Sequence, residues 1–244
     1  MFKQREYQKN KNIYYNTTNK SHVFELRSRG IHIICRFIVL TIIIFFNIKF
    51  IVELLEIPIS GIKLFQLSPD EYFIETIKIS FYSGLILLTP FFLTEFKLFL
   101  YPGLVKEEKK LLLPLLIMAI TLVFISLLFA YIVLIPAAIK FFILYSENVI
   151  APLWSFVDYF DFILSISLIT VIVFQIPTIQ LILGIFNIIS GTNMFNLGKY
   201  ITLGTFIISA ILTPSTDPLT QFLLSFAILV LYFLGSSLLV LLKG

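Results

Sequence analysis

The stretch LLLPLLIMAITLVFISLLFAYIVL, Leu111–Leu134, decides the fold class of this chain. It is an apolar run without a charged side chain, and a helix needs about 20 such residues to cross the hydrocarbon core of a bilayer. That core offers no water, so the backbone must satisfy its own hydrogen bonds, as an α-helix does. The stretch therefore predicts a transmembrane helix.

Similar runs on both sides of this stretch bring the expected number of spans to six. The last apolar region is broken by TPSTDP, Thr213–Pro218, whose two prolines and aspartate cannot continue a helix through hydrocarbon. We interpret the break as a hairpin between spans five and six. Span five, Ile201–Leu212, is then only about 18 Å long, short enough to thin the bilayer locally. The remaining spans are expected at Ile33–Val52, Phe73–Phe96, Phe162–Phe186 and from the hairpin to Leu242.

The composition agrees with a chain whose main solvent is lipid. Hydrophobic residues make up 59%, charged residues 13%, and the mean hydropathy is +1.00, whereas soluble domains carry about 25% charged residues. The single cysteine, Cys35, excludes an internal disulfide and any multi-cysteine metal site. Neither a P-loop nor a dinucleotide fingerprint occurs, so we expect no cofactor and no enzymatic activity.

The basic residues predict the orientation of the bundle. Six spans put both termini on one side, and most lysines and arginines fall on that side; the exceptions are Lys49, Lys63, Lys78 and Lys140. The positive-inside rule therefore places both termini in the cytoplasm, or in the stroma of a plastid. The net charge of +4 reflects this topology, and we expect no nucleic-acid binding.

Outside the spans, the sequence predicts a tail and two longer connections. Residues 1–20 are polar and basic and indicate a flexible tail, followed by one membrane domain over residues 21–244. The connections Glu53–Tyr72 and Lys140–Asp161 are rich in aromatics and proline. They suit simple interfacial anchoring, and the alternative is an ordered cap over that face of the bundle.

Six motifs, in order, give the chain its resemblance to a known family. They are SHVFELRSR (Ser21–Arg29), LSPDEYF (Leu67–Phe73), SGLILLTPFFLTEFKLFLYPGLVKEEKK (Ser83–Lys110), FAYIVLIPAAIKFF (Phe129–Phe142), VFQIPTIQLILG (Val173–Gly184) and ILTPSTDPLTQ (Ile211–Gln221). Together they resemble TatC, the multispanning subunit of the twin-arginine protein translocase, in its cyanobacterial and plastid branch. The phrases around Pro102-Gly103 and after Thr213 are the most specific.

The resemblance implies an all-α, concave, glove-like bundle that serves as signal-peptide receptor and core subunit. It implies the use of the proton-motive force to move folded proteins bearing a twin-arginine signal. The implied partners are TatA-like and TatB-like single-span subunits, precursor proteins, membrane lipids and further copies in a receptor complex. A multi-pass location in a plastid thylakoid membrane follows, with a bacterial plasma or thylakoid membrane as the alternative.

For signal-peptide binding, the resemblance points first to Glu108 and Phe99, and next to Glu25. Carboxylates suit this task, because a guanidinium is permanently charged and can pair with a carboxylate through two parallel hydrogen bonds. A solvated charged loop and an interfacial aromatic are the ordinary alternatives for the first two. Glu107 is a second carboxylate in the same loop. Glu95 lies four residues before Phe99, on the same helix face, and either binds peptide or pairs within the chain.

For docking of partner helices, the resemblance points to Gln175 and Gln221, with Asp217 one turn earlier. Many family members carry Glu where this chain has Gln175, which puts an acid-dependent mechanism in doubt. Asp217 has an ordinary alternative role as the N-cap of span six. The prolines and glycine expected to shape the backbone are Pro102, Gly103, Pro177 and Pro214.

Two other classes of function compete with the translocase subunit. A small secondary transporter would bind an ion or solute at a mid-membrane polar site formed by Glu95 and Gln175. Against it, the sequence shows no inverted repeat and no pair of broken helices. An assembly factor without transport activity would bind no signal peptide at all.

Overall fold

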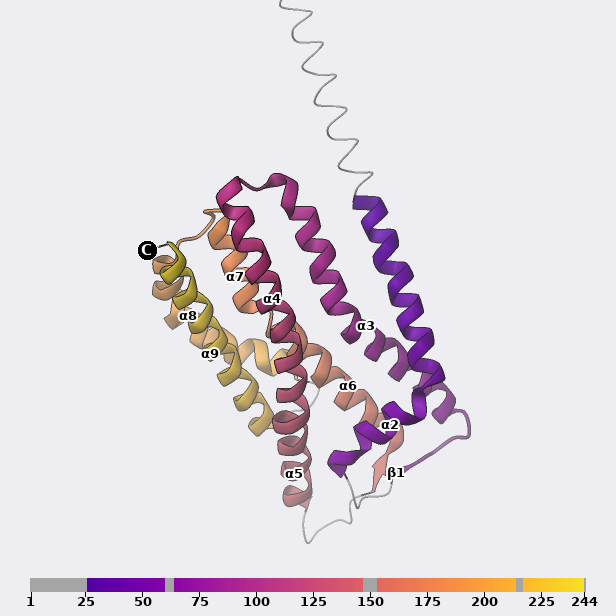
Figure 1. Ribbon diagram of the computed structural model, residues 1–244. Helices are drawn as coiled ribbons and strands as arrows, with labels where there is room; N and C mark the ends of the chain where they lie inside the picture. Colours follow the sequence, from indigo (N-terminus) through magenta and orange to yellow (C-terminus); the bar gives the residue numbers. More distant parts are fainter. Residues whose placement is uncertain (1–25, 60–63, 147–152, 214–216, 244) are drawn as a thin grey trace, which may run out of the picture.

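The computed structural model describes residues 26–59, 64–146, 153–213 and 217–243, and it is a bundle of helices (Figure 1). Six helical segments are long and apolar enough to cross a membrane, which confirms the predicted fold class. They are Leu26–Phe46, Glu71–Gly103, Glu108–Ser146, Phe156–Ile185, Gly191–Leu212 and Pro218–Leu241.

The two ends of the bundle differ in what they carry (Figure 1). One end of the bundle, which we call the near end, holds three segments. They are the start of the first helix, Leu26–Phe46, the turn η2, Tyr101–Gly103, and the end of α9, Pro218–Lys243. The far end holds α2, Ile48–Glu56, and the end of α5, Ile135–Ser146. Both ends of the described chain thus lie at the near end, as an even number of spans requires.

The first span differs from its expected bounds. It was expected at Ile33–Val52, but the helix already runs from Leu26 and ends at Phe46, before a turn at Asn47. The Asn47 side chain donates to the Ile43 carbonyl at 2.8 Å, and such local bonding competes with the helix ladder. The following helix α2 then takes a new direction over the far end.

Span three is much longer than the apolar run that predicted it. Helix α4, Lys106–Phe129, continues through a π-helical turn, η3, Ala130–Leu134, into α5. The Ile135 amide donates to the Ala130 carbonyl five residues back, and Pro136, which has no amide hydrogen, follows at once. The combined span of 39 residues is about 58 Å long, well beyond a bilayer core of roughly 30 Å.

Span five corrects the expectation of a 12-residue helix. Helix α8, Gly191–Leu212, has 22 residues, or about 33 Å at 1.5 Å per residue. Ser190 caps it by accepting a hydrogen bond from the Asn193 amide, so polar residues at the near end join the helix before the apolar run. The hydropathy of the sequence identified only the apolar half of this helix. Because the full helix is long enough to cross the bilayer core, the bilayer thinning inferred from a short span five has no basis.

Span four breaks where the sequence predicts a bend. Helix α6, Phe156–Val173, ends two residues before α7, Ile176–Ile185, and Pro177 occupies the first turn of α7. The span begins at Phe156, earlier than the expected Phe162. At the other end of α7, Asn187 adopts φ 56°, which closes the helix with bonds from Asn187 to Gly184 and from Ile188 to Leu183.

The far end carries an ordered cap, the alternative that the sequence left open. Strand β1, Leu64–Phe65, pairs in parallel with β2, Trp154–Ser155, and so joins the two connections. The hydroxyls of Tyr131 and Tyr159 donate to the carbonyls of Leu54 and Leu55 at 2.8 and 2.7 Å. These bonds satisfy carbonyls at the end of α2 that have no partner within the helix.

Close helix contacts depend on small residues. A Cβ on Gly84 of α3, Glu71–Leu100, would lie 2.6 Å from Oγ1 of Thr41 in the first helix, and one on Gly235 of α9 would lie 2.9 Å from Cα of Pro177. Helices in membranes pack through such small residues, because lipid supplies no hydrophobic drive for association. The main core lies where α3 packs on α6 and where η3 meets α6 and α9.

Candidate functional site

The turn at the near end between α3 and α4 presents Glu108. Glu108 is the third residue of α4, and its Oε2 accepts a hydrogen bond from the Val105 amide at 3.0 Å. This is the reciprocal half of a capping box. Among the described residues, no lysine or arginine forms an ion pair with the half-buried Glu108. Its negative charge is therefore available at the surface.

One neighbour of Glu108, Lys109, contacts an aromatic ring. Lys109 places Nζ 4.7 Å from the centre of the Tyr101 ring, which is a cation–π contact. Pro102 and Gly103 form the short η2 helix that reverses the chain. Phe99 is half-buried in the last turn of α3, and the near end thus combines a carboxylate with an apolar ring.

Glu95 occupies a different setting from the one expected for a peptide contact. It is 7% exposed, and its two oxygens accept hydrogen bonds from Arg29 at 3.1 Å and from Arg36 at 2.7 Å, both in the first helix. The arginines lie seven residues apart, so two turns of helix place both on one face, and Glu95 ties the first helix to α3.

Three of the candidate residues fall partly or wholly outside the described part of the chain. Glu25 and Pro214 lie among the residues that the structure does not describe. Glu107 is described only by its backbone in the first turn of α4. Their roles stay predictions.

Gln175 lies at the break of span four and bonds within the chain. Its Nε2 donates to the Ala119 carbonyl of α4 at 3.3 Å, and its Oε1 accepts from the Thr178 hydroxyl at 3.3 Å. The amide therefore joins α4 to α7 while the side chain stays half-buried. Both bonds are long, so an incoming polar group could replace them at low cost.

The hairpin residues Asp217 and Gln221 have separate tasks. Asp217 is 2% exposed and caps α9, because Oδ2 accepts from the Thr220 amide at 2.7 Å and from the Thr220 hydroxyl at 2.5 Å. Gln221 is half-buried and donates to the Phe206 carbonyl of α8 at 3.4 Å. Capping accounts for Asp217 in this state, and a docking role for either residue stays a prediction.

A buried cluster at the far end was missed by sequence reasoning. Glu75 of α3 has no exposed surface and lies 3.2 Å from Nζ of Lys78, which also bonds both carboxylate oxygens of Asp161 in α6 at 2.9 and 3.1 Å. A signal existed, because an acid and a lysine three residues apart share one helix face inside an apolar stretch. This spacing of Glu75 and Lys78 does not identify Asp161 on α6 as their partner.

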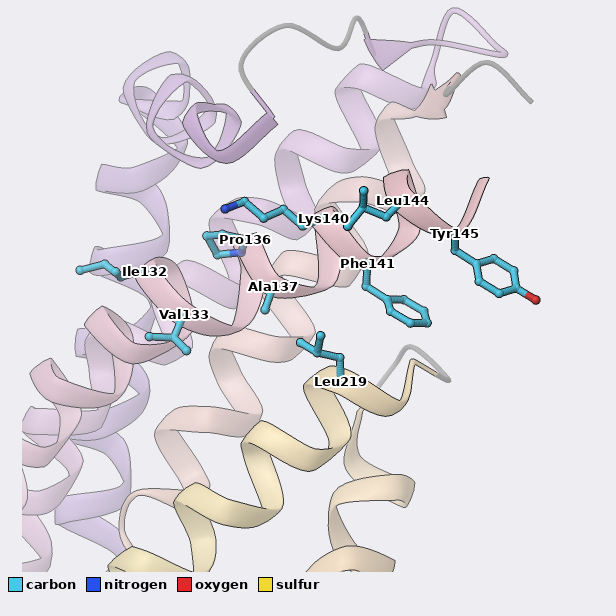
Figure 2. Close-up of a pocket in the computed structure, with 9 residues that line it drawn as sticks. All are labelled: Ile132, Val133, Pro136, Ala137, Lys140, Phe141, Leu144, Tyr145 and Leu219. Atoms are coloured by element: carbon cyan, nitrogen blue, oxygen red, sulfur yellow. The ribbon is translucent and has the colours of Figure 1, made fainter. Parts of the chain in front are cut away.

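A groove of about 710 Å³ runs along the surface of η3 and α5 (Figure 2). In the view, Phe141 and Ala137 point toward Leu219 of α9, whereas Lys140 extends along the other side of the helix. Lys140 is the charged member of an otherwise apolar or aromatic lining. Without a carboxylate, this groove does not suit an arginine-bearing peptide.

Comparison with known proteins yields one consistent family. A family model described as "Sec-independent protein translocase protein (TatC)" matches residues 21–226. The "uncharacterized tatC-like protein ycf43" of Trieres chinensis is 51% identical over 91% of this chain and 85% of its own. The TatC protein of Synechocystis is 42% identical over 88% of this chain and 84% of its own.

A plant relative and a solved structure extend the comparison. The chloroplastic TATC protein of Pisum sativum is 42% identical over 80% of this chain, which spans 56% of that longer protein. A crystal structure titled "Twin Arginine Translocase Receptor- TatC" matches with a TM-score of 0.78 and 32% identity, over 91% of this chain and all of its own. The relatives support the expected multi-pass location in a plastid thylakoid membrane.

Proposed function

Since this chain belongs to the TatC family of Sec-independent protein translocase proteins, a translocase subunit, we propose that it is the signal-peptide receptor of a twin-arginine translocase. In this proposal it is also the core subunit around which the translocase assembles. Folded precursors cross the membrane at the expense of the proton-motive force, and the chain carries out no covalent chemistry.

The observation that carries the receptor proposal is the contrast between two near-end carboxylates. Glu95 is already paired with Arg29 and Arg36, so another arginine would have to displace one of these two partners. Glu108, in the first turn of α4, has no ion-pair partner among the described residues. An arginine of the signal therefore pairs with Glu108, and Glu95 acts as a support.

The apolar part of the signal packs against Phe99, one turn beyond Glu95 on α3. Glu25 and Glu107 supply further negative charge for the second arginine. A cationic signal is attracted to such a group of carboxylates from a distance, which speeds the encounter but is weakened by salt.

Partner subunits dock elsewhere on the bundle. Single-span TatA-like and TatB-like helices pack on α7–α9, where the half-buried amides of Gln175 and Gln221 exchange their long internal bonds for bonds to the partner. Further copies of the chain complete the receptor complex.

Photo-crosslinking tests the receptor proposal. A photoreactive residue at Glu108 or at Phe99 is offered a precursor with a twin-arginine signal, and a twin-lysine signal serves as the matched control. Adducts confined to the twin-arginine precursor are expected. Equal adducts with both precursors, or none with either, would overturn the assignment of the site.

The alternative function, a secondary transporter, required a solute-binding site that these side chains do not form. It required Glu95 and Gln175 to bind a solute, but Glu95 is paired with arginines of the first helix and Gln175 bonds α4 and α7. No observation on the described residues favours this alternative.

A further inference from the structure

Glu75 is a buried carboxyl group that the receptor proposal does not use. It has no exposed surface, and neither of its oxygens has a hydrogen-bond partner. It forms an ion pair with Lys78, whose Nζ lies 3.2 Å away, but the hydrogen bonds of that ammonium go to both oxygens of Asp161. An ionised carboxylate left without hydrogen bonds in such a place is far more costly than a neutral acid.

The charges of this cluster do not balance if every group is ionised. Two carboxylates face one ammonium, so the fully ionised cluster carries one negative charge beside the apolar core. Lys78 and Asp161 already neutralise each other across α3 and α6, and both are partly exposed, at 37% and 46% of their side chains. Glu75 is therefore the group on which a proton removes the excess charge.

We propose that Glu75 is a proton-binding site and that its proton decides where Lys78 binds. With the proton on Glu75, Lys78 bonds Asp161 and bridges α3 to α6, which is the arrangement described here. When the proton leaves, the new carboxylate, already 3.2 Å from Nζ of Lys78, competes with Asp161 for that ammonium, and the bridge to Asp161 weakens. The cluster is thus a latch between two spans whose ligand is a proton.

Lys78 and Asp161 are the two charged residues on which we expect the protonation of Glu75 to depend. Among the described residues, Lys78 from its own helix lies at ion-pair distance from Glu75, and Asp161 from α6 binds the same lysine. Helix α2 also packs on α3 and brings Glu53 and Glu56, of which Glu56 acts on Tyr159. Helix α4 has its charged residues only within its first five positions, at the opposite end, and η2 has none.

The position of the latch suggests how it is used. Glu75 is in the second turn of α3 at the far end, and it lies beside the partly exposed Lys78–Asp161 pair. This use rests on the proposed function: if transport consumes a proton gradient, the far side supplies the proton that closes the latch. The protonation of Glu75 itself does not depend on that proposal.

Infrared spectroscopy of the purified full-length chain in lipid tests the site directly. With the glutamate carboxyl carbons isotopically labelled, we expect the carbonyl band of a protonated, buried glutamic acid at neutral pH. The band is lost in Glu75→Gln, and the matched control Glu53→Gln keeps it. Absence of the band in the wild type, or its survival in Glu75→Gln, would overturn the proposal.

Two further variants keep the test decisive if Glu75→Gln does not fold. Asp161→Asn frees Lys78 to pair with Glu75, so the band is lost although Glu75 is intact. Lys78→Met removes the cation, so the band persists to a higher pH than in the wild type. The reverse pattern would show that Glu75 is ionised beside Lys78.

Transport assays separate this site from the receptor proposal. Vesicles holding Glu75→Gln should bind the twin-arginine precursor with unchanged affinity but lose the dependence of transport on the pH of the far compartment. Failure of the wild type to bind the precursor would refute the receptor and leave the infrared result standing. Unchanged pH dependence in Glu75→Gln would refute the use of the latch.

Discussion

Arg36 in the first helix lies 2.7 Å from a carboxylate oxygen of Glu95 in α3. The first helix is the least buried of the six spans, and this ion pair and the one from Arg29 tie it to α3. Glu95→Ala should lower the free energy of unfolding by about 2 kcal/mol, between the values for surface and buried pairs. Thermal unfolding in detergent measures it.

A double-mutant cycle separates this pairing from other effects of Glu95. Arg36→Ala should cost less in the Glu95→Ala background than in the wild type, because the contact is already gone. Equal costs in both backgrounds would show that the two residues do not interact.

Glu108→Gln should weaken binding of a twin-arginine peptide about 10-fold or more, because it removes a charge-assisted bond while an amide still accepts from the Val105 amide. The helix start therefore stays intact. Titration calorimetry measures the affinity. Asp158→Asn, which removes an exposed charge at the far end, is the control, and an equal loss in both variants would mean a general effect of charge.

Gly84→Ala should push the first helix away from α3. The new Cβ would lie 2.6 Å from Thr41 Oγ1, and overpacking of this kind costs about 1–3 kcal/mol. The thermal midpoint should fall, and the second change Thr41→Ala should restore it, because the remaining neighbours of the Cβ are 3.4 Å away or more. A double variant as unstable as Gly84→Ala would contradict this contact.

Tyr159→Phe should loosen the far-end cap. The buried hydroxyl donates to the Leu55 carbonyl at 2.7 Å, and its loss costs about 1 kcal/mol and leaves a carbonyl unpaired. Faster proteolysis of the segment after α2 is the expected result. Tyr145→Phe, on an 82% exposed ring, should change nothing; equal rates in both variants would argue against an anchoring role for Tyr159.

Ser68→Ala should raise the pKa of Asp70. The Ser68 hydroxyl bonds a carboxylate oxygen of Asp70 at 2.5 Å, and this bond lowers the pKa of that carboxyl below its ordinary value. The stability that this bond gives to the start of α3 is therefore present above the pKa of Asp70 in the unfolded chain. It is lost as pH falls through the pKa of Asp70 in the folded chain. NMR titration of labelled aspartate measures the change, and an unaltered pKa would exclude the bond in solution.

Local sequence was sufficient for the features that depend on the chain's solvent. The apolar run Leu111–Leu134 predicted a spanning helix because no other backbone arrangement is satisfied in lipid. Pro177 predicted the break in span four, since proline removes a backbone donor. Helix bounds were less predictable: Gly191–Tyr200 mixes polar and apolar residues yet is helical, because capping by Ser190 extends a helix beyond its apolar part.

Only the tertiary structure decided which charged side chains already have an ion-pair partner within the chain. By sequence, Glu95 and Glu108 are similar near-end carboxylates, and Glu75 attracted no notice. Folding brings Arg29 and Arg36 to Glu95 and Asp161 to Lys78 across 59 to 83 residues of chain, and it leaves Glu108 without a cation among the described residues. Hydropathy is a property of each segment, whereas an ion pair depends on two helices meeting in a particular register.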